Sequence, residues 1–562
     1  MIKVRLSVII FSLFLLPCAF AEEKLPAVSQ KPVSPPAQAQ PQAPLFQRYK
    51  VYADPAKTLG SSNSIRDFFG SGGALYYITG NFDDPVVQAW RNLDFKQITF
   101  EAMHVEEPMD RWIQVTVDEK GEVQIDFSEY DRYIRSYIEN LNARPFVYLG
   151  NIPRALSSKP NDPDYAVYMP KTLKLWQSFV KKIVQHNIQK FKLKGLNYGV
   201  LGEPDHPDSW KGSGSSDPKI VLNEHIELYA ATYRAVKAAD PSAKFGGPAT
   251  MSWKATEFTP AARFVLKDWI QALAQYNQKA GPGKAIKPDF ISWQDYGWAG
   301  PDISDGAEAV SGYLKEYGFD PAIPKMLAGS GWGSWASNYL DKDQPSYERA
   351  SHVVHSLIGE FGNPQTRKFF QAIYYSFYFN DYWMTPETEA DLQAQRSVSL
   401  VIIPKDRPFQ LTPIYAAFQM AHEILGGEVA EASAEKPLEA MSVWNDVTKK
   451  FYLLFTNLSA KTVIADVAVD HFPIAEPVQT KMKSIDEFHS VDGYGLEGGF
   501  DIDLVKTGVH SEVSVLVKPH GTILLTFGKP EPKPEPSAQV PGKEEKKADD
   551  GSVPPAQIHF NE

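Results

Sequence analysis

Acidic, amide and aromatic side chains follow directly after several β-like segments of this 562-residue chain. The carboxyl groups among them that are candidates for catalysis are Glu203, Glu101 and Asp295. Two carboxyl groups facing one bond can act as general acid, general base or nucleophile. The other members of this set suit a sugar, whose hydroxyls need hydrogen bonds and whose apolar faces stack on rings. They are Asn151, Gln294, Tyr296, Trp332, Asn380 and Asp381.

Strand-like and helix-like segments alternate from residue 49 to residue 426. The helical pattern TLKLWQSFVKKIVQHNIQKF (172–191) precedes LNYGVLGEP (196–204), and HIELYAATYRAVKAAD (225–240) precedes AKFGGPAT (243–250). About eight such units predict a parallel (β/α)₈ barrel with helices outside it. A doubly wound open sheet is the competing fold, but no GxGxxG follows the first strand. In a barrel, the residues at the strand ends share one mouth, where active sites lie.

The helical pattern stops after residue 426. KKFYLLFTNLS (449–459), TVIADVAVDHF (462–472), SEVSVLV (511–517) and GTILLTF (521–527) are β-rich and separated by turn residues. We therefore expect a C-terminal antiparallel β-sandwich over residues 427–528.

Charge and cysteine content exclude several functions. The formal net charge is −11, which argues against nucleic-acid binding as the main role. The one cysteine, Cys18, excludes a disulfide framework, a cysteine-based zinc site and an iron–sulfur cluster. His352 and His355 lie three apart without an acidic ligand beside them, so we interpret them as a packed helix face. We expect no metal and no cofactor.

The two ends of the chain differ from its body. Lys3 and Arg5, an apolar run and Ala19-Phe20-Ala21 have the layout of a secretory signal peptide over residues 1–21. Cleavage after Ala21 is favoured over lipidation of Cys18. The protein is then expected to be exported, to the periplasm or outside the cell, and not to be an integral membrane protein. Residues 22–48 and 529–562 are rich in proline and are expected to be disordered linkers, or docking tails for an envelope partner.

Several stretches of the body resemble one known family. DFSEYDRYIRSYIENLNARPFVYLGNIPRAL, ELYAATYRAVKAADPSAKFGGPAT and PDFISWQDYG are similar, in order, to stretches of glycoside hydrolase family 39, which contains β-xylosidases and α-iduronidase. LTPIYAAFQMAHEIL and VKPHGTILLTF resemble the family's closing barrel segment and its accessory sandwich. The resemblance implies a retaining (β/α)₈ glycosidase fold from about residue 49 to residue 527.

The resemblance assigns one catalytic carboxyl group and fails for the other. The family's acid/base glutamate corresponds to Glu203, but the asparagine before it is Gly202 here. The nucleophile position falls on Gly329, or on Gly331 if the following Trp is aligned, and no Asp or Glu occurs from residue 321 to residue 340.

Other positions expected in the pocket also differ from the family pattern. An arginine on the second strand is lost in Thr99-Phe100-Glu101-Ala102, and the pocket histidine becomes Gln294, while Tyr296 is kept. The last-strand tryptophan corresponds to Phe377. The substrate-binding residues expected from the resemblance and the strand ends are Gln294, Tyr296, Trp332, Trp335, Phe377 and Asn151.

Three hypotheses follow. The first is an exported protein that binds a poly- or oligosaccharide and has lost or altered hydrolysis, a pseudoenzyme. The second is an active glycosidase in which Glu203 acts as general acid with Glu101 or Asp295 as a relocated carboxylate. The third is a structural envelope protein that interacts through its proline-rich tails.

Overall fold

The computed structural model describes seventeen stretches of the chain, and structural statements below refer to them. They are residues 46–61, 69–72, 85–93, 97–101, 113–200, 202–256, 259–295, 303–330, 346–362, 369–375, 401–402, 410–424, 426–472, 479–486, 500–502, 505–507 and 510–529.

Eight parallel strands close into a barrel in the order β10-β11-β2-β3-β6-β7-β8-β9. This confirms the predicted (β/α)₈ fold. In chain order the strands are β2 (Phe69–Gly72), β3 (Gln97–Glu101), β6 (Arg144–Tyr148), β7 (Asn197–Gly199), β8 (Lys244–Thr250), β9 (Phe290–Asp295), β10 (Lys325–Ser330) and β11 (Phe369–Tyr375).

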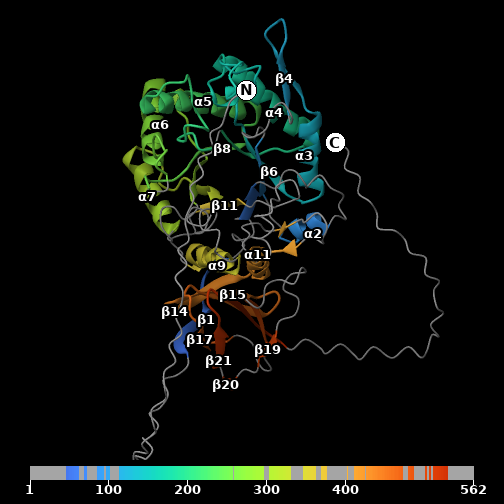
Figure 1. Cartoon of the computed structure of the whole chain (residues 1–562), viewed down its shortest axis with the longest axis vertical. Helices are drawn as coiled ribbons and strands as arrows, with labels where there is room; N and C mark the ends of the chain where they lie inside the picture. The colour runs from blue at the N-terminus through green and yellow to red at the C-terminus, as the bar shows by residue number, and fades with distance from the viewer. Residues whose placement is uncertain are drawn as a thin grey trace, which may run out of the picture. The chain divides into compact units, whose positions relative to one another are not determined.

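Helices connect the strands and form the outer layer of the barrel (Figure 1). They are α2 (Pro85–Asn92), α3 (Ser128–Glu139), α4 (Leu173–Phe191), α5 (Pro218–Ala239), α6 (Leu266–Ala280), α7 (Ile303–Glu316), α9 (Ser346–Gly362) and α11 (Pro413–Glu423). Local sequence sets their ends: the Thr172 side chain accepts a hydrogen bond from the Leu175 backbone at the start of α4, and Asp217 caps α5 ahead of Pro218.

The barrel interior is filled by side chains. Phe146, Tyr148, Phe290 and Met326 form a buried cluster there with Ala249 and Ala328. A larger cluster lies between the strands and the helices and includes Trp176, Trp210 and Trp269. The C-terminal ends of the strands therefore lie above a packed interior, and the barrel is not an open pore.

The second part is a ten-stranded sheet in the order β19-β18-β22-β16-β15-β14-β1-β17-β21-β20. Its strands are β1 (Gln47–Ser61), β14 (Glu428–Ala434), β15 (Leu438–Asn445), β16 (Lys450–Asn457), β17 (Val463–Val469), β18 (Gln479–Ile485), β19 (Phe500–Ile502), β20 (Val505–Thr507), β21 (His510–Val517) and β22 (Thr522–Gly528). The β-rich C-terminal domain is thereby confirmed.

The first strand of the body belongs to this sheet, not to the barrel. β1 pairs antiparallel with β14 and parallel with β17. The expected barrel start at residue 49, the linker end at residue 48 and the purely antiparallel sheet therefore differ from the structure. The physical reason is that Val51 and Ala53 bury their side chains in the core of the sheet, which lies more than 370 residues further along the chain.

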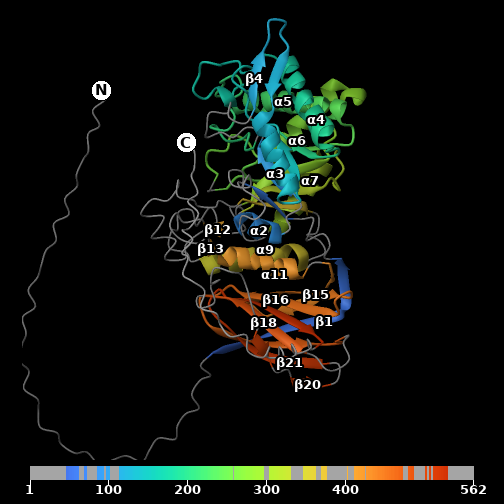
Figure 2. The ribbon, with the colours of Figure 1, turned by 90° about the vertical axis from the view of Figure 1, so that its right-hand side faces the viewer.

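The sheet buries both faces. In β16, Phe451, Leu453 and Phe455 pack into the sheet's own core, whereas Tyr452 and Leu454 join the barrel's core. The strand period of two produces this alternation. The face of the sheet opposite its own core packs against two helices. The helix α9 contacts β14, β15, β16 and β22, and α11 contacts β18. Figure 2 shows these two helices between the barrel and the sheet.

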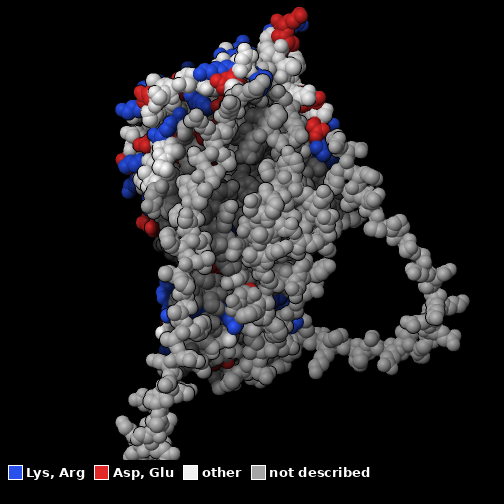
Figure 3. All heavy atoms as spheres, in the orientation of Figure 1, with Lys and Arg blue, Asp and Glu red and all other residues white. Residues whose placement is uncertain are grey.

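Two shorter pairs complete the described elements. The strands β4 (Gln114–Val117) and β5 (Val123–Asp126) form a hairpin that projects beyond α3 and α4 (Figure 2). Asp118, Glu119 and Glu122 lie exposed at its tip, and Figure 3 shows acidic atoms gathered there, while both signs of charge mix over the neighbouring helices. The other pair is β12 (Val401–Ile402) with β13 (Gln410–Leu411).

Candidate active site

The ends of the parallel strands bring most of the predicted site positions to one edge of the barrel. Glu101 ends β3 and is paired in register with Tyr148, the last residue of β6. On the other side, Gln294 of β9 is paired with Gly329 of β10, and Asp295 is paired with Ser330. Because all eight strands run in parallel, these positions share the C-terminal rim with Glu203, which follows β7.

Glu203 is held through its backbone in an unusual conformation. Its φ of +50° lies in the left-handed region, which residues with a Cβ atom rarely occupy. Its backbone N donates to the carbonyl oxygen of Ala249 (2.9 Å), and its own carbonyl oxygen accepts from the backbone N of His206 (2.9 Å). The side chain is half-buried. The general-acid candidate is therefore fixed at the strand end by main-chain bonds on both sides.

Gly202 departs from the family pattern without a steric reason. It is exposed, and a Cβ atom added there would meet nothing within 4 Å. Its φ is not among the positive values of the chain. The space and the backbone at this position thus admit a larger side chain such as asparagine.

Asn151 and Gln294 are the two predicted sugar-binding residues whose side chains the structure describes. Asn151 follows β6, is 5 % exposed and has a left-handed φ of +58°. Gln294 is half-buried, and its buried Oε1 has no hydrogen-bond partner within the described residues. A buried acceptor without a partner is costly, so Gln294 is suited to accept a hydrogen bond from a ligand hydroxyl.

A second carboxyl group beside Glu203 was missed by the sequence analysis. Asp205 lies in the loop between β7 and α5 and is 1 % exposed. Burial raises the pKa of Asp205 to about 8, and the nearby Glu203 charge acts in the same direction. The raised pKa keeps this carboxyl group mostly protonated at neutral pH. Only the short spacing from Glu203 could have drawn attention to it.

The end of β10 has no carboxyl group. Its six residues read KMLAGS, and Lys325, the one charged residue, is buried at the start of the strand. Gly329, one of the two nucleophile positions, lies in this strand, while Gly331 lies outside the described residues. The structure therefore places Gln294, not an acid, beside Gly329.

The remaining predicted site residues lie outside what the structure describes. For Glu101 and Asp295 it places the backbone in β3 and β9 but not the side chains. The aromatic residues Tyr296, Trp332, Trp335 and Phe377 are also outside the described stretches, as are Asn380 and Asp381.

The described residues contain neither a cluster of metal-ligating side chains nor a membrane-spanning helix. No group there of three or more His, Cys, Asp or Glu could hold a metal ion. His352 lies in α9, and burial lowers its pKa to about 4, as expected for a packed helix face. No helix in the described part of the chain is long and apolar enough to cross a membrane.

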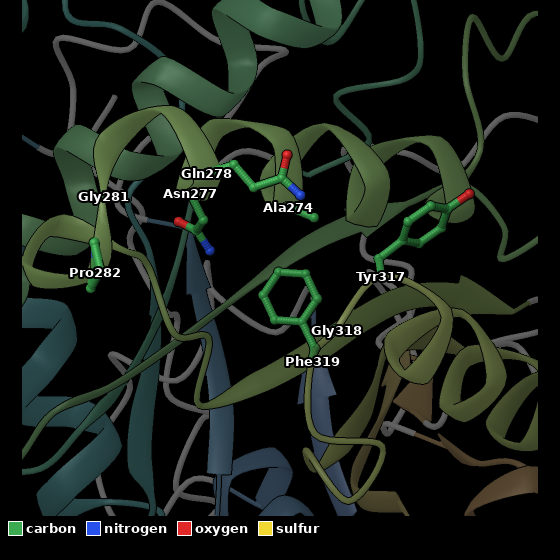
Figure 4. A pocket seen from close by; sticks show the side chains of 8 residues that line it. All are labelled: Ala274, Asn277, Gln278, Gly281, Pro282, Tyr317, Gly318 and Phe319. Atoms are coloured by element: carbon green, nitrogen blue, oxygen red, sulfur yellow. The ribbon is translucent and has the colours of Figure 1, made fainter.

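A surface pocket of about 510 Å³ lies away from this rim (Figure 4). Its walls come from the C-terminal ends of α6 and α7 and the turns that follow them. Since α6 precedes β9 and α7 precedes β10, the pocket lies at the opposite face of the barrel from the strand ends. Its lining residues are Ala274, Asn277, Gln278, Gly281, Pro282, Tyr317, Gly318 and Phe319.

The eight-stranded barrel, the β-rich second domain and a glutamate after β7 define a glycosidase-like protein of the (β/α)₈ class. Residues 49–305 match the family model of glycosyl hydrolases family 39, so the chain is family 39-like. The match includes Glu203 and ends before β10, the strand on which the second catalytic carboxyl group is expected.

Curated relatives match parts of the chain. A β-xylosidase of Geobacillus stearothermophilus is 31% identical over 142 residues, which cover 24% of this chain and 27% of that protein. A β-xylosidase of Caldicellulosiruptor saccharolyticus is 24% identical over 186 residues, or 32% and 33% of the two proteins. The chain thus spans between a quarter and a third of the length of these relatives.

Solved structures support the fold over a longer range. The GH39 enzyme from Xanthomonas axonopodis pv. citri superimposes with a TM-score of 0.61 at 16% identity, covering 86% of this chain and 98% of that one. A monomeric β-xylosidase from Caulobacter crescentus CB15 gives 0.60 at 15% identity, covering 86% and 100%. At these identities the likeness concerns the fold alone.

Proposed function

We propose that this chain is an exported protein that binds a poly- or oligosaccharide at the mouth of a family 39-like barrel and has lost retaining hydrolysis. The observation that carries the proposal is the contrast between two strand ends. Glu203 follows β7, whereas β10 contains no carboxyl group. Retaining hydrolysis needs two carboxyl groups about 5–5.5 Å apart, one of them the nucleophile.

The remaining acid cannot replace the missing step. A positioned general acid contributes about 10²–10⁴-fold in rate, whereas enzymes accelerate their reactions by about 10⁶-fold or more. Binding does not require the nucleophile, because hydroxyl-accepting groups such as the Gln294 Oε1 remain at the rim. Since two curated relatives are named β-xylosidases, β-1,4-xylo-oligosaccharides are the first probes to use.

The competing function is an active glycosidase with Glu203 as acid and Glu101 or Asp295 as base. One observation favours it: β3 and β9, which end in these residues, each lie two strands from β7 around the barrel. An inverting mechanism places its two carboxyl groups about 6.5–9.5 Å apart.

The test measures binding and cleavage with the same ligand. The full chain is titrated with xylo-oligosaccharides by calorimetry, and the mixture is then separated by chromatography to detect released xylose. We expect saturable binding without release, and about tenfold weaker binding for Gln294→Ala, which removes a hydrogen bond worth about 1.4 kcal/mol. Asp208→Asn is the matched control, because its side chain in the Glu203 loop is 85% exposed.

Two results would overturn the proposal. Xylose release that disappears in Glu203→Gln would establish the competing glycosidase. Absence of binding to xylo-oligosaccharides and to a broader set of envelope and plant glycans would favour the structural envelope role of the proline-rich tails.

A further inference from the structure

The buried carboxyl group of Asp205 connects the loop that carries Glu203 to the neighbouring loop of the barrel mouth. Both Oδ atoms lie 3.1 Å from the backbone N of Met251, which donates to them. Met251 follows β8, and Asp205 belongs to the loop between β7 and α5. Because Asp205 is 1 % exposed, water cannot take over this hydrogen bond if the carboxyl group is lost.

Arg263 also donates hydrogen bonds to the loop that contains Asp205. Its backbone N donates to the carbonyl oxygen of Asp205 (2.9 Å). Its guanidinium donates to the carbonyl oxygen of His206 (3.4 Å) and to that of Trp210. Residues 205–210 are therefore bonded to the loop between β8 and α6 at several points.

These bonds hold an unfavourable backbone in place. Glu203, at φ +50°, donates its backbone N to Ala249, which itself has φ +59°. Such conformations persist only where surrounding contacts determine them. The Asp205 side chain makes its two hydrogen bonds to Met251 two residues after Glu203 in the chain.

The charges that face Asp205 come from two elements. Glu203 lies in its own loop, and Arg263 lies in the loop before α6. Exposed Asp208, in the same loop as Asp205, also faces Arg263. The guanidinium bonds of Arg263 described above go to backbone carbonyls. Burial is the largest influence on Asp205 and raises its pKa to about 8, so ionisation there adds a buried negative charge next to Glu203.

We propose that Asp205 is a positioning residue that holds Glu203 in the barrel mouth through its hydrogen bonds to the Met251 backbone. Ionisation of Asp205 keeps its bond to Met251 but places a second negative charge beside Glu203, and this repulsion disfavours the position of the Glu203 carboxylate. The inference rests on the proposed function for the ligand that Glu203 faces. The hydrogen bonds between Asp205 and Met251, however, are present in the ligand-free protein.

The first experiment needs no ligand. The full chain is labelled with ¹³C at glutamate carboxyl groups, and the Glu203 resonance is assigned by its absence in Glu203→Gln. Between pH 4 and pH 10 we expect two inflections of this resonance, one from Glu203 itself and one near pH 8 from Asp205. Asp205→Asn should remove the second inflection, whereas the matched control Asp208→Asn should keep it.

The second experiment measures xylo-oligosaccharide affinity at pH 7 and pH 9. The affinity of the unaltered chain should fall severalfold at pH 9, and that of Asp205→Asn should not change between the two values. Asp205→Ala should bind about tenfold more weakly at pH 7, because a displaced site group loses productive geometry. Asp205→Asn keeps an acceptor for Met251, so it carries the test even where the alanine variant does not fold.

The outcomes separate the two proposals. The inference is overturned if Glu203 shows a single inflection, if Asp205→Asn keeps the second one, or if folded Asp205→Ala binds normally. If the two inflections behave as expected but no ligand binds, the proposed function fails and the positioning role of Asp205 stands.

Discussion

Two carboxyl groups in different regions of this molecule, buried Asp205 and half-buried Glu439, have pKa values shifted in opposite directions. At the barrel mouth, Asp205 is bonded to a backbone N–H, and burial raises its pKa to about 8. At the contact between α9 and β15, Glu439 is 14% exposed and meets His355 and Lys436. Burial acts on Glu439 too, but the hydrogen bonds from these two residues lower its pKa overall.

The difference separates a structural site from a functional one. The α9–β15 contact joins the barrel to the sheet, and pairing of charges there lets an acid be buried without a large penalty. Asp205 itself accepts from the Met251 backbone, and its loop also contains a left-handed Glu203. Strained backbone and acids with raised pKa gather at functional sites, which is why the mouth is the better candidate for ligand chemistry.

The largest expected effect concerns the pH dependence of stability in Asp205→Asn. In the folded chain the pKa of Asp205 lies above its ordinary value of 3.8. The stabilisation from the neutral form is therefore complete below pH 3.8 and is lost as the pH rises through 8. Relative to the unaltered chain, the variant should gain about 2 kcal/mol between pH 4 and pH 8, since one pKa unit is worth about 1.4 kcal/mol and relaxation absorbs part of it. Urea unfolding at these pH values measures the gain. If the difference in free energy of unfolding between the variant and the unaltered chain did not change with pH, the raised pKa of Asp205 would be contradicted.

The second prediction concerns Glu439, whose contribution to stability depends on pH in the opposite direction from that of Asp205. The pKa of Glu439 is lowered in the folded chain, so its stabilisation is present above the ordinary value of 4.5 and is lost as the pH falls below it. Glu439→Gln should cost about 1–2 kcal/mol at pH 7, because the negative charge of the group that contacts His355 is removed. The same urea series should show this cost shrinking in acid. A cost that grows in acid would contradict the pairing.

The smallest expected effect on stability is that of removing Lys436, the exposed partner of Glu439. The Lys436 side chain is 78% exposed, so Lys436→Ala should cost less than about 0.5 kcal/mol. The cost should decline further in high salt, which screens exposed charges. A loss equal to that of Glu439→Gln would mean that Lys436, rather than His355, neutralises the acid.

The sequence predicted the larger features of this molecule for identifiable reasons. Strand–helix alternation and the resemblance led to the barrel, and the Gly-Glu-Pro stretch after a β-like run led to Glu203 at a strand end. These signals are local or belong to a family pattern, so they can be detected in one chain.

Features created by distant packing were not predictable. β1 joins a sheet whose other strands come hundreds of residues later. Asp205 lies in the polar stretch Asp-His-Pro-Asp, which is typical of an exposed loop, but it is buried and bonded to the backbone of Met251 and Arg263. Neither its neighbours in sequence nor its residue type indicates that burial.

We propose that this glycosidase-like mouth keeps its acid, Glu203, but has no nucleophile. The most direct measurement is the intact mass of the chain after incubation with an activated 2-deoxy-2-fluoro xyloside, a substrate type that leaves a retaining enzyme covalently glycosylated. We predict an unchanged mass at a concentration that saturates binding. A mass increase of one glycosyl unit, located on a carboxyl group at the barrel mouth, would contradict the account.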